Sequence, residues 1–189
     1  MRKFLLTLFI AQCAIVATFA KDEFKLFVPD AQGIVSVTKM IPTSKSEDEV
    51  VKLVIKSLCE EDGNIEKVSD NLYRGIFQTQ SYINPFSGST RRSLKLSVNI
   101  VVADGVATLT FTDLYMLEVY AGYGLHEKNI NLSDKMTEYF AAKKMVTEKS
   151  GSKKEINEAK DIIENVEDDI YPTEEEFAKR LSNAERALR

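Results

Sequence analysis

Residues 92–114, with the sequence RSLKLSVNIVVADGVATLTFTDL, decide the fold of this chain. Apolar and polar residues alternate along them, which predicts two β-strands. Asp104-Gly105 lies between the strands and predicts a type I′ turn, because glycine adopts a positive φ without strain. The turn sets the register so that Val98 faces Phe111. One side of the hairpin is then apolar, whereas the other carries threonine, asparagine and lysine. This pattern indicates an antiparallel sheet with one buried and one open face.

The first twenty residues have the features of a secretory signal. Two basic residues precede an apolar run, Phe4–Val16, and small residues follow it. We therefore expect Met1–Ala20 to be removed on export. A membrane anchor is an alternative, but the run is shorter than the ~20 apolar residues that span a bilayer. Lipid modification of Cys13 is a second alternative, and Gln12 argues against it because that processing needs a small residue before the cysteine.

Composition excludes several kinds of protein. The chain has 189 residues, of which 44% are hydrophobic, and this suits one globular domain with an appendage. Its formal net charge is −4, and loss of two basic residues with the signal makes it more negative. An acidic, exported chain is a poor nucleic-acid binder, since phosphate contacts need clustered Lys and Arg. Cys59 is the one cysteine outside the signal, so we expect no intramolecular disulfide and a buried thiol.

The remaining patterns predict an α+β domain. The sequence predicts strand, helix, four strands and helix, in that order, with an antiparallel sheet of about five strands and the helices on one face. The expected elements are a strand over Ile34–Ile41, a helix that Ser46 caps, a hairpin around Asp70-Asn71, the central hairpin, and a helix over Leu132–Lys149.

Two segments carry a likeness to a known family. Asn71–Phe77 is similar to a turn followed by a glycine-containing strand, and Leu94–Thr112 to an alternating strand, an Asp-Gly turn and a return strand. In these segments the chain resembles a bacterial family of exported proteins of unknown function with a TATA-box-binding-protein-like fold. The likeness covers roughly Ile34–Val146. It implies the fold and supplies no catalytic or binding residues. We therefore divide the chain into a signal (1–20), a domain (21–149) and a charged tail (150–189).

The tail is expected to form two helices. Pro172 interrupts its apolar stripe, and Thr173 with Glu176 forms a capping box that would start a second helix. The stripe consists of Ile156, Ala159, Ile163, Val166 and Ile170, followed by Phe177, Leu181, Ala184 and Leu188. We expect a helical hairpin with its own seam, because two helices already cover the sheet. The alternative is self-association with a second copy through these helices.

Two segments rich in turn-forming residues contain the candidate ligand-binding side chains. Gln80–Arg91 is expected to be a loop because of its Asn, Pro, Gly and Ser, and Tyr115–Asn129 is expected to be loosened by Gly122 and Gly124. The candidates are Tyr82, Phe86, Tyr115, Tyr120 and Tyr123. Such tyrosines suit stacking on a sugar ring or on an apolar patch of a partner. The alternative is that they pack on the core or cover an edge of the sheet.

No motif for catalysis is found. His126 is the single histidine, and without a companion Cys or His it does not predict a zinc site. The sequence also lacks a Ser-His-Asp order and a glycine-rich phosphate loop, so we expect no catalytic residue and no cofactor. The favoured function is an exported, periplasmic or secreted, non-enzymatic module that binds an unknown protein or glycan of the bacterial envelope. A hydrolase with a carboxylate pair is the alternative. Nucleic-acid binding by analogy with the fold's namesake is disfavoured by the acidic charge.

Overall fold

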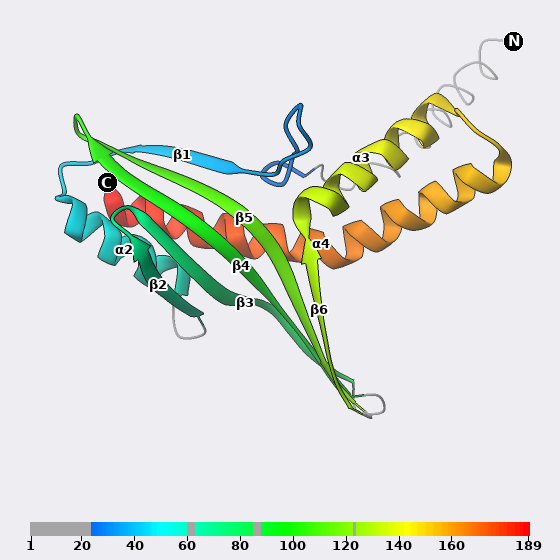
Figure 1. Ribbon diagram of the computed structural model, residues 1–189, viewed down its shortest axis with the longest axis horizontal. Helices are drawn as coiled ribbons and strands as arrows, with labels where there is room; N and C mark the ends of the chain where they lie inside the picture. Colours follow the sequence, from blue (N-terminus) through cyan, green and yellow to red (C-terminus); the bar gives the residue numbers. More distant parts are fainter. Residues whose placement is uncertain (1–23, 60–62, 85–87, 123) are drawn as a thin grey trace, which may run out of the picture.

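The computed structural model describes residues 24–59, 63–84, 88–122 and 124–189, without the side chains of 82–84 (Figure 1). The predicted signal, Met1–Ala20, lies outside these residues, as do Phe86 and Tyr123. The described elements are β1 (Val37–Pro42), α2 (Glu47–Cys59), β2 (Gly63–Ser69), β3 (Leu72–Asn84), β4 (Gly88–Ala103), β5 (Val106–Ala121), β6 (Leu125–Asn131), α3 (Leu132–Glu148) and α4 (Lys153–Leu188).

The strands form one six-stranded antiparallel sheet. Its order is β1-β5-β4-β3-β2, and β6 also pairs with β5. Both β1 and β6 use β5 as their partner: β1 pairs with it near Phe111, and β6 pairs with it from Tyr115 to Ala121. Helices α2, α3 and α4 pack against one face, which we call the inner face, and the opposite, outer face exposes Lys95 and Asn99. The predicted α+β class is confirmed.

The central hairpin has the predicted turn and register. Asp104 and Gly105 adopt φ values of 52° and 75°, as a type I′ turn requires. Val98 pairs with Phe111, and both side chains are fully buried on the inner face. They share one core with Val54 of α2. The strands that flank Asp104-Gly105 are therefore the centre of the sheet.

A bulge lets β5 continue beyond the predicted hairpin. Asp113 has a φ of 51°, and its carboxylate accepts a hydrogen bond of 2.9 Å from the Ser97 hydroxyl. The register of β4 and β5 shifts between Lys95 and Ser97. One extra residue changes the phase of the alternation, so that Leu114, like Phe111, is buried.

Two segments expected to be irregular are strands, and these predictions were wrong. Within Gln80–Arg91, β3 extends to Asn84 and β4 begins at Gly88. Within Tyr115–Asn129, most residues belong to β5 and β6. Antiparallel pairing of β3 with β4, of β4 with β5 and of β5 with β6 satisfies the backbone of both segments, and this gain outweighs the turn preference of their small residues.

The predicted pair of helices in the tail is also wrong. Residues Lys153–Leu188 form one helix of 36 residues, α4, with Pro172 inside it. Ser152 and Glu155 make a complete capping box at its start, and this contact lowers the pKa of Glu155. Proline removes one helical hydrogen bond, but the buried side chains of Ile170 and Phe177 on either side hold the helix in place. The helix changes direction part-way along (Figure 1).

The C-terminal half of α4 completes the hydrophobic core. Phe177 is fully buried and lies 5.1 Å from Phe111, measured between ring centroids. Leu188 is also fully buried, and its carbonyl accepts a hydrogen bond of 2.7 Å from the Thr43 hydroxyl. The first half of α4 packs on α3, where the Tyr139 hydroxyl donates to Glu167 over 3.1 Å. The inner face therefore accommodates α4 together with α2 and α3, contrary to our expectation for the tail.

Candidate functional site

Four strands extend beyond the helices and form an arm (Figure 1). We define the arm as residues 81–84 of β3, 88–91 of β4, 117–121 of β5 and 125–129 of β6. Backbone pairing holds it together, with Ser89 and Leu125 both opposite Ala121. None of the helices that the structure describes covers the arm, so the arm presents both faces of its sheet to a partner.

An aromatic pair lies on the inner face of the arm. Tyr120 of β5 pairs with His126 of β6, and their rings stack with centroids 6.4 Å apart and planes 23° apart. Thr90 of β4 is the next residue in this row and is only 9% exposed. Tyr82 of β3 pairs with Thr90, so its backbone occupies the same row. The register thus brings two of the predicted tyrosines, Tyr82 and Tyr120, to the same row.

The outer face of the arm is partly apolar. Leu117 and Val119 are half-buried, and Leu125 is 68% exposed. Tyr115 lies on this outer face because it is an odd number of residues from Tyr120 in an uninterrupted stretch of β5. It pairs with Lys95 and Asn131 at the base of the arm. The structure therefore separates Tyr115 from Tyr120.

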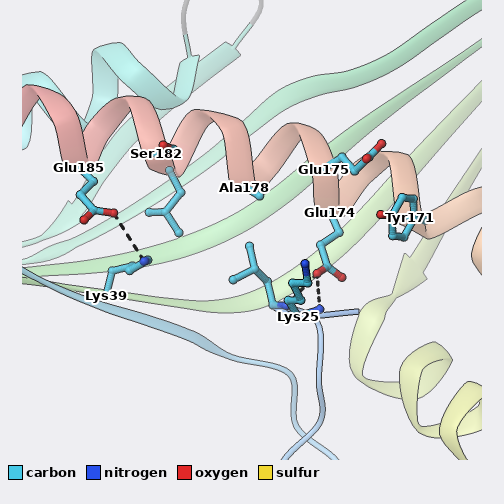
Figure 2. Close-up of a pocket in the computed structure, with 10 residues that line it drawn as sticks. Lys25, Lys39, Tyr171, Glu174, Glu175, Ala178, Ser182 and Glu185 are labelled. Carbon is cyan, nitrogen blue, oxygen red and sulfur yellow. Dashed lines mark hydrogen bonds and ion pairs between the residues drawn. The ribbon is translucent and has the colours of Figure 1, made fainter. Parts of the chain in front are cut away.

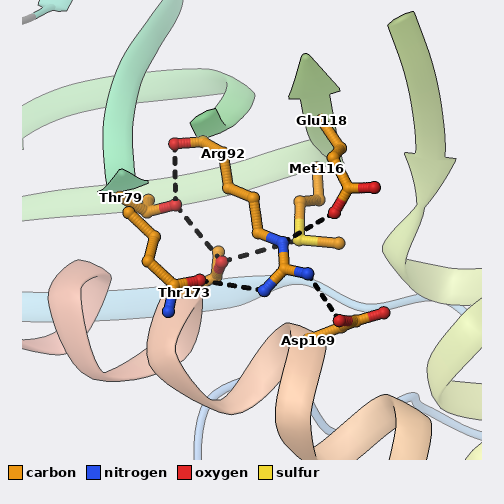
Figure 3. A network of polar contacts seen from close by, with 7 residues as sticks. Thr79, Arg92, Met116, Glu118, Asp169 and Thr173 are labelled. Atoms are coloured by element: carbon orange, nitrogen blue, oxygen red, sulfur yellow. Dashed lines mark hydrogen bonds and ion pairs between the residues drawn. The ribbon is translucent and has the colours of Figure 1, made fainter. Parts of the chain in front are cut away.

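A buried arginine joins the base of the arm to α4 (Figure 3). The guanidinium of Arg92 donates hydrogen bonds to Glu118 over 2.7 Å, to Gln80 over 2.9 Å and to Asp169 over 2.6 Å. These partners belong to β5, β3 and α4, and only 9% of the Arg92 side chain is exposed. The planar fork of arginine holds several acceptors at fixed angles. Arg92 therefore orients the arm relative to the helices.

A second polar contact lies beside this arginine. The hydroxyls of Thr79 and Thr173 are 3.2 Å apart, and the Thr173 hydroxyl is 3.6 Å from the sulfur of Met116. Thr79 also donates to the backbone carbonyl of Arg92 over 3.3 Å. Figure 3 shows these side chains between the sheet and α4. The contacts add a second link between the arm's base and the middle of α4.

Sequence analysis missed Arg92, Glu118 and Asp169. A signal for Arg92 existed, because it precedes Leu94 at the same phase of the alternation and therefore falls on the buried face. A charged residue in that position needs a buried partner. The partners belong to distant segments, and only the folded chain identifies them.

The chemistry of the arm suits binding. The stacked rings of Tyr120 and His126 form a flat surface with polar edges, which suits a sugar ring or an apolar patch of a protein. Within the described residues, no group of three His, Cys, Asp or Glu side chains has the arrangement to hold a metal ion. In the same part of the chain, no helix is both long and apolar enough to cross a membrane.

Comparisons with known proteins give two structural neighbours. One is a TBP-like protein from Parabacteroides distasonis, with a TM-score of 0.35 and 14% identity over 57% of this chain and 72% of the other. The second is a DUF4468 family protein from Bacteroides ovatus, with a TM-score of 0.33 and 15% identity over 53% of this chain and 64% of the other. No protein-family model and no curated protein matches the sequence. The descriptions of both neighbours name no ligand and no activity.

Proposed function

We propose that this protein is an exported, non-enzymatic module that binds a protein or glycan of the bacterial envelope through its arm. The observation that carries the proposal is the stacked pair Tyr120 and His126 on a sheet extension that no helix covers. A chain gains little stability from such an extension, since its side chains remain accessible to water on both faces. Binding of a partner would bury side chains of the arm that the fold leaves accessible to water, such as His126.

The inner face of the arm is the proposed contact surface. Its row crosses four strands, with Thr90, Tyr120 and His126 in register with the backbone of Tyr82. The aromatic side chains of Tyr120 and His126 offer a large contact area at a small cost in conformational entropy. The Arg92 contacts hold the base of this surface against α4. A surface held in one orientation loses less entropy on binding than a mobile one.

Site-specific photo-cross-linking in the producing cell tests the contact surface. We expect Tyr120→p-benzoylphenylalanine to give a discrete adduct with an envelope component. The matched control is Lys154→p-benzoylphenylalanine on the first turn of α4, where the native side chain is 86% exposed. It should give no such adduct. Equal labelling at the two positions, or no adduct at position 120, would reject the arm as the contact surface.

Export is the second part of the proposal, and it depends on the predicted signal. The basic start and the short apolar run of Met1–Ala20 support it. Mass spectrometry of protein from the producing cell should find an N-terminus at or near Lys21. If most of the protein is cytoplasmic with an intact Met1 terminus, export is contradicted. The cross-linking experiment would still decide whether the arm is a contact surface.

The absence of catalysis is part of the same proposal. With His126 as the sole histidine, acid–base catalysis near neutral pH would depend on that one imidazole or on carboxyl and amine groups with shifted pKa values. We expect the protein to be inactive towards envelope polysaccharides and peptides. Turnover that a chelator suppresses and His126→Ala abolishes would instead support the hydrolase alternative.

A further inference from the structure

A groove runs between α4 and the segments that precede and form β1. Its volume is about 570 Å³, which is within the range of small-molecule sites. Leu26, Ala178 and Leu181 contribute apolar surface to it. Its polar lining consists of Lys25, Lys39, Glu174, Glu175, Ser182 and Glu185. Figure 2 shows the helical members along one side of α4, and we call this feature the α4 groove.

Glu174 is the residue of the groove that the fold leaves incompletely satisfied. It is 6% exposed, and its Oε1 accepts hydrogen bonds from the backbone N–H groups of Lys25 and Leu26 over 2.6 and 2.8 Å. Its Oε2 is buried, and among the described residues it has no hydrogen-bond partner. A buried carboxylate oxygen without a donor is costly, because it has lost its water. Oε2 is therefore an acceptor that a ligand can satisfy when the side chains that cover it turn aside.

The opposite charge lies further along the groove. Lys39 of β1 approaches Glu185 with a distance of 3.6 Å between Nζ and Oε2, and 41% of its side chain is exposed. The hydrogen bond from Arg189 lowers the pKa of Glu185, and the positive charge of Lys39 lowers it further. Glu185 is therefore ionised and has two cations beside it. Figure 2 shows the Lys39–Glu185 pair separated along α4 from Glu174. Lys39 can therefore turn to a ligand anion while Arg189 stays with Glu185.

We propose that the α4 groove binds a short zwitterionic peptide. Its ammonium group donates to Oε2 of Glu174, and its carboxylate meets Lys39. A hydrogen bond between two charged groups in a site shielded from water is stronger than one between neutral groups. The apolar surface of Leu26, Ala178 and Leu181 receives an aliphatic side chain.

The mixed charge of the groove favours a zwitterion over ligands that carry two charges of the same sign. A dication would satisfy Glu174, but Lys25 and Lys39 would repel it. A dianion would be repelled by Glu174 and Glu175. Like charges that are held close together disfavour binding. A ligand with one charge of each sign avoids both conflicts.

Nuclear magnetic resonance titration with alanyl-alanine and leucyl-leucine tests the proposal on the full mature chain. Both probes should shift the amide signals of Ala178 and Ser182, and the N-acetylated forms, which lack the ammonium group, should bind at least about tenfold more weakly. The C-amidated forms should also bind more weakly, and Lys39→Gln should remove this preference for a free carboxylate.

Glu174→Gln is the decisive variant. Its amide oxygen can still accept from Lys25 and Leu26, whereas its NH₂ group replaces Oε2 and cannot accept from an ammonium. We expect it to fold and to lose about tenfold or more in affinity for both dipeptides. Glu158→Gln, elsewhere on α4 and 59% exposed, is the matched control and should bind as the unmodified chain does.

Several outcomes would overturn the proposal. They are no signal shift with millimolar dipeptide, equal binding of the acetylated and free forms, or unchanged affinity in Glu174→Gln. Each of them would make Glu174 a structural clamp for the segment that contains Lys25. If Glu174→Gln fails to fold, the comparison of free and acetylated dipeptides on the unmodified chain decides the question by itself.

Discussion

Phe177 lies where α4 meets the sheet and the N-terminal segment. Its ring stacks with Phe27 at 5.9 Å and with Phe77 at 6.3 Å, and Phe111 contacts it edge-on at 5.1 Å. All four side chains are at most 1% exposed. Aromatic contacts of these geometries add to the free energy gained from burial alone. A single residue of α4 thus connects the central hairpin, β3 and the segment before β1.

Substitutions at Phe111 and Thr110 test the register at the residue scale. Phe111→Ala should lower the free energy of unfolding by about 3–5 kcal/mol, because it leaves a cavity beside Phe177. Thr110→Ala lies on the outer face and should cost under about 1 kcal/mol. Urea denaturation followed by circular dichroism measures both. Equal losses at the two positions would contradict this assignment of the two faces of β5.

Arg180 shows what sequence patterns do not reveal about single residues. It is 2% exposed, it donates to the carbonyls of Leu58 and Gln78 over 2.6 and 3.0 Å, and its guanidinium carbon lies 4.5 Å from the Phe77 ring centroid. In the sequence it is one of many charged residues of the tail, and only its spacing of three residues from Phe177 places it beside the apolar stripe. Its role depends on carbonyl groups that only tertiary structure brings to it.

At the scale of elements, α4 takes part in the core more than its charged composition suggests. Its buried residues continue at steps of three and four on both sides of Pro172, so the apolar stripe stays on one side of the helix. Sequence analysis identified this stripe and its residues correctly. It wrongly divided the stripe between two helices at Pro172. Proline ends a helix unless tertiary contacts hold the helix on both sides of it, as they do here.

Removal of residues 150–189 tests the role of α4. We expect the shortened mature protein to lose cooperative unfolding. Removal of the fully buried Phe177 and Leu188 would expose the apolar surface of the sheet that these side chains cover. Calorimetry and binding of a hydrophobic dye should show a poorly packed state in the shortened chain. Phe177→Leu in the full chain is the milder companion variant and should still unfold cooperatively. A shortened protein with a sharp transition would mean that the sheet, α2 and α3 suffice.

The strands β5 and β6 were harder to predict than the turn that precedes them. The Asp104-Gly105 turn is a local signal, and the structure confirms it. The bulge at Asp113 reverses the alternation, so the pattern ends in the sequence although the strand continues to Ala121. The existence of β6 depends on its pairing with β5, and Gly122 and Gly124 resemble a break rather than the tip of a hairpin. For this reason the position of Tyr120 and His126 on one row was not predictable.

At the scale of the whole molecule, the protein has a packed body and a projecting arm. Leu109 and Phe111 of β5 are fully buried in the body, whereas Ala121 at the other end of the same strand is exposed. Stability within a fold follows such differences in burial, since local opening costs less where few apolar contacts are broken. The arm should therefore open more readily than the body while both remain parts of one sheet.

Amide hydrogen exchange measures this gradient. The amides of 119–121 should exchange about a hundredfold or more faster than those of 109–111. Arg92→Met removes the hydrogen bonds to Glu118, Gln80 and Asp169, and it should accelerate exchange in the arm more than in the body. Lys95→Met, on the exposed outer face, is the control. Uniform exchange along β5 in the unmodified protein would show that the arm is as stable as the body.

The pairing of β1 with β5 has a consequence for the order of folding. Val37 of β1 and Phe111 of β5 are separated in the sequence by α2 and the strands β2 to β4. Each pair of consecutive strands from β2 to β6, in contrast, is joined by a short connection. Contacts between residues far apart in sequence form slowly, because the chain must first lose the entropy of a long loop. We expect the β2–β6 meander to form early and β1 and α4 to join it late. During synthesis the part of the apolar face that Phe177 and Leu188 cover would then stay exposed until α4 is made, and we expect the nascent chain to be prone to aggregation at that stage.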